Sequence, residues 1–158
     1  MKLLIFIYGL LIGSFLNVCI FRIPKKESIA FPSSYCPKCK TKLKWYDNIP
    51  LLSFILLRGK CRYCKDKISV QYPLVEFSNA ILYLILYNHF GLSIDFIFYA
   101  LISSVLVAIT FIDLLEMLIP DSLVIIILIL SILQKILNYK INGVSPNVIG
   151  SFIFTFFY

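Results

Sequence analysis

Histidine is nearly absent from this sequence, which argues against a large class of hydrolases. His89 is the only histidine among 158 residues. It stands close to Gly91 at the end of an apolar stretch, and we interpret it as an interface residue. Serine and cysteine proteases activate their nucleophile with a histidine base. The sequence therefore offers no basis for a catalytic Ser–His or Cys–His pair.

Charged residues are also scarce, and acidic residues most of all. Charged residues make up 15% of the chain, with 15 Lys and Arg against 8 Asp and Glu. Apolar residues account for 60%, and the mean hydropathy is +0.91. This composition excludes an ordinary soluble domain.

The apolar residues form blocks long enough to cross a bilayer. Residues 3–21, 77–94 and 96–112 are uncharged stretches of 19, 18 and 17 residues, and about 20 apolar residues span a membrane as a helix. Residues 122–137 are a fourth candidate, because the long side chain of Lys135 can reach the surface. We therefore predict an all-α polytopic membrane protein with four transmembrane helices.

An incomplete fifth helix is predicted at the end of the chain. Residues 147–158 are apolar but number only 12. As a helix they would measure about 18 Å, against about 30 Å of hydrocarbon. We therefore expect the chain to be truncated.

Lysine and arginine are concentrated in one loop. Residues 22–73 hold 12 of the 15, whereas only Lys2 precedes the first apolar stretch. Basic loops stay in the cytoplasm, so we expect the N-terminus outside. A cleaved signal peptide is disfavoured, because a single lysine gives only a weakly charged n-region and no small-residue cleavage site follows the apolar stretch. The net charge of +7 then reflects topology and contact with anionic lipid rather than nucleic-acid binding.

Two Cys-x-x-Cys pairs lie in this loop. Cys36 and Cys39 form the first, Cys61 and Cys64 the second, with 21 residues between the pairs. Two such turns can face each other around one tetrahedral ion. Two disulfides and four free thiols are the alternatives. Disulfides are disfavoured because the cytoplasm is reducing. Free thiols are disfavoured because a loop with few apolar residues needs a bound metal or a cross-link to hold a fixed shape. We therefore predict a small zinc-ribbon-like cytoplasmic module with one structural zinc.

An apolar segment within the loop has two interpretations. Residues 50–57 are too short to span a membrane. They form either the core of a small cytoplasmic module or a patch that dips into the membrane interface. Trp45, Tyr46 and Tyr63 suit the headgroup region as well.

Small and polar residues in the first two apolar stretches suggest helix contacts. Gly9 and Gly13 form a small-xxx-small face that lets another helix approach closely. Asn17 is expected to face protein and not lipid, and Cys19 is expected to be a small packing residue. For Glu76, placed in the first turn of the second span, capping of the helix and a functional role stand at even odds.

Three carboxylates follow the third apolar stretch within nine residues: Asp113, Glu116 and Asp121. A carboxylate at the membrane surface is costly and indicates function by default. We assign function to Asp113, which ends an uncharged helix. We interpret Glu116 and Asp121 as markers of where helices meet water, with Asp121 beginning a helix after Pro120.

Taken in order, these residues resemble the bacterial prepilin peptidases, also called type IV prepilin leader peptidases. The resemblance covers essentially the whole chain, and no single motif carries it. The motifs are Gly13-Ser-Phe-Leu-Asn17 with Arg22 and Pro24, Cys36-x-x-Cys39, Trp45-Tyr-Asp-Asn-Ile-Pro50 with Ser53, Arg58-Gly-Lys-Cys61-x-x-Cys64, Ile68-Ser69, Tyr72-Pro73 with Glu76, and Asp113 with Pro120-Asp121.

The resemblance implies a multi-pass aspartic endopeptidase of the bacterial inner membrane. Such enzymes cut the leader of prepilins or pseudopilins at the cytoplasmic face, for type IV pili, type II secretion or competence. Many then N-methylate the new N-terminus with S-adenosylmethionine. The family's first catalytic aspartate matches Asp113. Its second lies in a Gly-x-Gly-Asp motif, and none of the six glycines here precedes an aspartate, so we expect this chain to be inactive alone.

The resemblance also suggests a division of the chain and its partners. Residues 1–76 would hold the first span and the cysteine loop, and residues 77–158 an incomplete membrane peptidase domain. Prepilin substrates and membrane lipid are the expected partners, with no nucleic acid. A non-enzymatic zinc-binding membrane scaffold is the alternative, although it leaves Asp113 without a role. A Gly-x-Gly-Asp segment in the downstream reading frame would decide for the peptidase.

Overall fold

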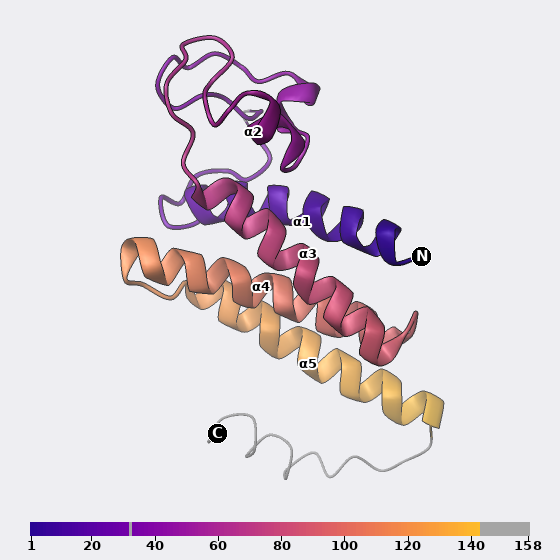
Figure 1. Ribbon diagram of the computed structural model, residues 1–158. Helices are drawn as coiled ribbons and strands as arrows, with labels where there is room; N and C mark the ends of the chain where they lie inside the picture. The colour runs from indigo at the N-terminus through magenta and orange to yellow at the C-terminus, as the bar shows by residue number, and fades with distance from the viewer. Residues whose placement is uncertain (32, 143–158) are drawn as a thin grey trace.

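Four long helices dominate the molecule. The computed structural model describes residues 1–31 and 33–142, which are helical apart from loops and two isolated β-bridges. The long helices run roughly along one direction (Figure 1) and are α1 (Lys2–Arg22), α3 (Gln71–Phe90), α4 (Ile94–Glu116) and α5 (Asp121–Asn142). The predicted all-α class is confirmed.

The basic loop joins α1 to α3 and contains two short helices. These are the 3₁₀-helix η1 (Trp45–Asn48) and α2 (Leu52–Leu56). The C-terminus of α1, the N-terminus of α3 and the α4–α5 turn all lie at one end of the bundle (Figure 1), here called the loop end. The basic loop and Asp113 therefore share this end.

Among the described residues, three helices are long and apolar enough to cross a membrane: α1, α4, and α5 over Asp121–Asn138. A multi-pass membrane protein is thus supported. The 20-residue helix α3 is less apolar because it carries Glu76 and Asn79, and its membrane crossing stays a prediction. The predicted fifth span falls on residues 147–158, outside the described residues.

Glycines let α1 and α3 pack with their backbones in contact. A Cβ atom built on Gly9 would lie 2.6 Å from Cα of Ala80, and one on Gly13 would lie 2.6 Å from Cα of Glu76. Because both pairs repeat at four-residue spacing, the contact runs along one face of each helix. The predicted small-xxx-small packing is confirmed, and the partner helix is α3.

Buried polar side chains join three helices. Asn79 on α3 donates a hydrogen bond to the Gly9 carbonyl oxygen of α1 at 2.8 Å. Ser104 on α4 donates to Oδ1 of Asn79 at 2.9 Å, and its hydroxyl also lies 3.1 Å from that of Tyr83. Such bonds fix helix register inside an apolar bundle. This network also explains why α3 carries polar residues: they face protein.

Asn17 and Cys19 lie as expected. Asn17 is buried and donates from Nδ2 to the Tyr72 carbonyl oxygen at 3.1 Å, so it faces α3 and not lipid. Cys19 is buried and makes no disulfide, as a small packing residue would. Both therefore support the tight packing of α1 against its neighbour.

Candidate functional sites

The two Cys-x-x-Cys segments fold as two near-identical knuckles. In the first, Lys40 N–H bonds the Cys36 carbonyl oxygen at 2.9 Å, and in the second Lys65 N–H bonds that of Cys61 at 3.0 Å. Both lysines have positive φ, 56° and 62°. This conformation turns the chain back so that both cysteines of a pair point to the same side. The repeated sequence spacing thus gives a repeated local structure.

The knuckles bring the four cysteines into one cluster. The sulfur atoms of Cys36, Cys39, Cys61 and Cys64 all lie within 4.8 Å of one another, and those of Cys36 and Cys64 are 3.9 Å apart. None forms a disulfide. Four sulfurs around zinc, with bonds of about 2.3 Å, stand about 3.8 Å apart. The cysteine cluster therefore has the donors and spacing to hold one metal ion.

Local hydrogen bonds give the thiols of Cys39 and Cys64 different pKa values. Thr41 hydrogen-bonds Cys39 through its side chain and backbone and lowers the pKa of that thiol to about 6. A backbone hydrogen bond from Asp66 lowers the pKa of Cys64, but burial and hydrogen bonds to the other three thiols raise it more, to about 11. Without an ion, Cys39 is thus the readier thiolate, and metal binding has to displace the proton of Cys64.

Asp47 braces the second knuckle, a role that sequence reasoning did not identify. Its carboxylate accepts hydrogen bonds from the Lys44 N–H, the Arg62 Nε and the Tyr63 hydroxyl. Burial raises the pKa of Asp47, but these hydrogen bonds outweigh it and hold the pKa below its usual value. The sequence did offer one signal for Asp47: acidic residues are scarce in the basic loop, where only three residues before α3 are acidic.

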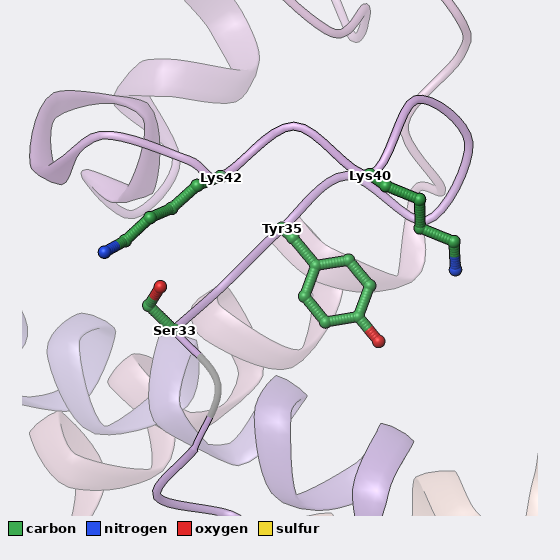
Figure 2. Close-up of a pocket in the computed structure, with 4 residues that line it drawn as sticks. All are labelled: Ser33, Tyr35, Lys40 and Lys42. Atoms are coloured by element: carbon green, nitrogen blue, oxygen red, sulfur yellow. The ribbon is translucent and has the colours of Figure 1, made fainter.

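A shallow hollow lies on the first knuckle. Ser33, Tyr35, Lys40 and Lys42 line it, and its volume is about 370 Å³ (Figure 2). The two lysine side chains point to opposite sides of Tyr35 (Figure 2). Because their charges do not converge, we assign no ligand to this hollow.

Glu76 does not cap its helix, so that interpretation was wrong. The helix begins at Gln71, and its first turn holds no acidic residue. The buried Glu76 instead accepts the N–H of Leu51 at 2.8 Å. Leu51 has φ 56°, an unfavourable conformation for leucine. Glu76 therefore fixes the start of α2 against α3.

The three carboxylates near the α4–α5 turn are exposed. Asp113 lies in the last turn of α4, which ends at Glu116, and α5 begins at Asp121 as predicted. Within the described residues, none of the three side chains has a hydrogen-bond or ion-pair partner. Asp113 is thus free to contact a further group at the loop end. No hydrogen bond links Asp113 to Asp121 within the described residues.

Comparison with known proteins places the chain in a family. Residues 7–90 match the family described as Bacterial Peptidase A24 N-terminal domain. This match covers more than half of the chain and includes α1, the cysteine cluster and α3. The chain belongs to this family of bacterial prepilin leader peptidases.

Relatives of similar sequence carry names from the same family. The chain is 44% identical over 119 residues to the prepilin leader peptidase/N-methyltransferase of Myxococcus xanthus, covering 75% of this chain and 36% of the relative. It is 37% identical over 146 residues to that of Legionella pneumophila, covering 78% and 51%. The chain therefore spans between a third and a half of these relatives' length. No solved structure matches it.

Proposed function

We propose that this chain is the N-terminal part of an aspartic endopeptidase that cleaves the leader of type IV prepilins or pseudopilins at the cytoplasmic membrane face. The observation that carries this proposal is Asp113, an exposed carboxylate in the last turn of α4 with no hydrogen-bond partner in residues 1–31 and 33–142, in a chain of the prepilin peptidase family. Type II secretion and competence pseudopilins belong to the same substrate class.

Asp113 would be one half of the catalytic pair. Aspartic proteolysis uses two carboxylates that share a proton: one activates water, and the other protonates the carbonyl or the leaving group. The sequence has no Gly-x-Gly-Asp motif to supply the second aspartate. We infer that this chain is inactive alone and that the pair is completed by residues beyond it.

The setting of the site is proposed with it. The enzyme would lie in the bacterial inner membrane with its N-terminus outside, with α3 as a further span. The cysteine cluster would hold structural zinc, since its sulfur spacing suits that ion. Zinc would fix the shape of a loop too small to fold on an apolar core.

The decisive experiment uses the full reading frame that contains this chain. Asp113→Asn keeps the size of the side chain but removes the base, so cleavage of prepilin in isolated membranes should fall by orders of magnitude. Glu116→Gln removes a neighbouring exposed carboxylate and should process at the normal rate. If Asp113→Asn also cleaves normally, the assignment is wrong and the zinc-binding scaffold is the better explanation.

N-methylation of the cut pilin is a second proposed activity. The relatives' names include N-methyltransferase, and S-adenosylmethionine would be the methyl donor. Methyl transfer needs no aspartyl pair, so Asp113→Asn should still methylate a pilin that has been cut beforehand. Transfer of labelled methyl groups to pre-cut pilin measures this directly, and loss of transfer in this variant would argue against separate activities.

A further inference from the structure

The short helix α2 presents apolar side chains to its surroundings. Leu52, Ile55 and Leu56 are 57%, 66% and 79% exposed, and Trp45 is 79% exposed on η1, which packs against α2. We call these four residues the α2 patch. Side chains this exposed do not form the core of a module, so that interpretation of residues 50–57 is wrong for them. A patch of this kind marks a contact surface.

The depth of α2 follows from the helix contacts. Leu51, directly before α2, donates its N–H to Glu76, and Glu76 packs against Gly13. Gly13 precedes Arg22, the last residue of α1, by nine residues, which is about 13 Å along the helix. The Glu76 side chain reaches back toward the loop end by several ångströms. The start of α2 therefore lies roughly 8 Å inside the loop end of α1.

The picture of the molecule agrees with this depth. In Figure 1, α2 stands at the level of the C-terminal half of α1, not beyond its end. On α1, Leu11 and Phe15 flank Gly13 and are 51% and 50% exposed. If α1 crosses the bilayer, side chains at this level face lipid. The α2 patch is then level with a lipid-facing part of the molecule.

Basic residues flank the α2 patch on both sides. Lys44 directly precedes η1, and Arg58 and Lys60 follow α2, and all three are exposed. Exposed cations beside tryptophan, leucine and isoleucine are typical of segments that lie in the membrane interface. A protein partner could also contact the apolar residues, but it would not require α2 to lie level with the lipid-facing part of α1. The charges favour an anionic lipid surface.

We propose that the α2 patch inserts into the headgroup region of the leaflet at the loop end, with anionic lipid as its partner. Insertion docks η1 and α2 on the bilayer. Asp47 on η1 in turn holds the second knuckle. Lipid contact thereby positions the cysteine cluster relative to the bundle. The proposal requires only that α1 spans the membrane and does not depend on peptidase activity.

Trp45 allows a direct test, because it is the only tryptophan in the sequence. The purified protein is reconstituted into phosphatidylcholine–phosphatidylglycerol vesicles. Tryptophan fluorescence is then measured with lipids brominated near the headgroup end of the acyl chain, with lipids brominated near its methyl end, and with aqueous acrylamide. We expect strong quenching by the first lipid, weaker quenching by the second, and little by acrylamide.

Variants separate patch insertion from other causes. Replacing Leu52, Ile55 and Leu56 with serine should reduce quenching by the shallow bromine by about twofold or more. The matched control, Ile29→Ser with Phe31→Ser, alters two exposed apolar residues elsewhere in the loop and should leave quenching unchanged. Arg58→Gln with Lys60→Gln should make quenching insensitive to phosphatidylglycerol content. If the triple variant binds less metal than the wild type, the single variant Leu56→Ser is tested in place of the triple variant.

Three outcomes would overturn the proposal. Quenching of Trp45 by acrylamide and not by bromolipid would place the α2 patch in water. Protection from both quenchers would mean that protein, from the same chain or another, covers the patch. Equal quenching in the wild type and in the patch variants would show that these side chains do not hold Trp45 at the interface.

Discussion

Arg62 Nε lies 2.7 Å from Oδ1 of Asp47, and this bond joins the Trp45–Asn48 turn to the second knuckle. The carboxylate side chain is only 2% exposed, whereas that of Arg62 is 45% exposed. Arg62 and Tyr63, which bonds the other oxygen, both lie between Cys61 and Cys64. Asp47 therefore sets the position of Cys61 and Cys64, half of the cysteine cluster.

Replacing Asp47 should weaken metal binding. Asp47→Ala removes three exposed hydrogen bonds, each worth about 0.5–1.5 kcal/mol net, and should lower zinc affinity about tenfold. Chelator competition on the purified protein measures this affinity. The control is Asp66→Ala, which breaks only an exposed 3.9 Å ion pair with Lys38 and should change affinity little.

The pH dependence of this effect has a definite sign. Because the pKa of Asp47 is lowered on folding, its stabilisation is fully present above the unfolded pKa of about 3.9 and is lost only as pH falls through the lower folded value. The difference in loop stability between wild type and Asp47→Asn should therefore be constant from about pH 5 to 8. A difference that shrinks steadily across this window would contradict the assigned role.

The cysteine cluster should bind one zinc per chain. Cys61→Ser removes a ligand and should release the metal and loosen the loop, because binding energy is also folding energy here. Cys19→Ser is the matched control, since Cys19 is buried in α1 and lies outside the cluster. Metal analysis and protease sensitivity of the loop report both effects. A metal-free wild-type protein with a resistant loop would exclude a structural zinc.

Gly13 should be intolerant of any side chain. In Gly13→Ala the new Cβ meets the backbone of Glu76 at 2.6 Å, so no rotamer change relieves the clash, and we expect a loss of about 1–3 kcal/mol. Leu11→Ala, on an exposed part of the same helix, should cost less. Unfolding in mixed detergent–denaturant titrations gives both values. Equal stability of Gly13→Ala and wild type would mean that α1 and α3 separate readily.

Patterns local in the sequence predicted most of the bundle. Apolar stretches located α1, α3, α4 and α5, although α3 begins earlier than predicted, and the spacing of Gly9 and Gly13 indicated close helix packing. The two Cys-x-x-Cys pairs located the cluster, because each knuckle is built from a few consecutive residues. These features depend on short-range geometry, which a single sequence displays directly.

Contacts between distant segments were not predictable in the same way. Capping was one of two interpretations of Glu76 because its position near a helix start is visible in the sequence, whereas its actual partner, Leu51, is 25 residues away. Asp47, Asn79 and Ser104 likewise act on residues that only the folded chain brings near. One sequence without covarying positions carries no signal for such pairs.

The remaining prediction concerns which side of the membrane the cysteine loop faces. The loop holds 12 of the 15 lysines and arginines, which favours the cytoplasm. On intact cells, a membrane-impermeant thiol reagent should label Leu92→Cys, in the exposed turn between α3 and α4 at the opposite end from the loop. It should reach Phe31→Cys, in the loop, only after the membrane is permeabilised. The reverse pattern would put the four thiols in an oxidising compartment, where sulfurs this close would form disulfides. The argument for bound zinc would then fail together with the topology.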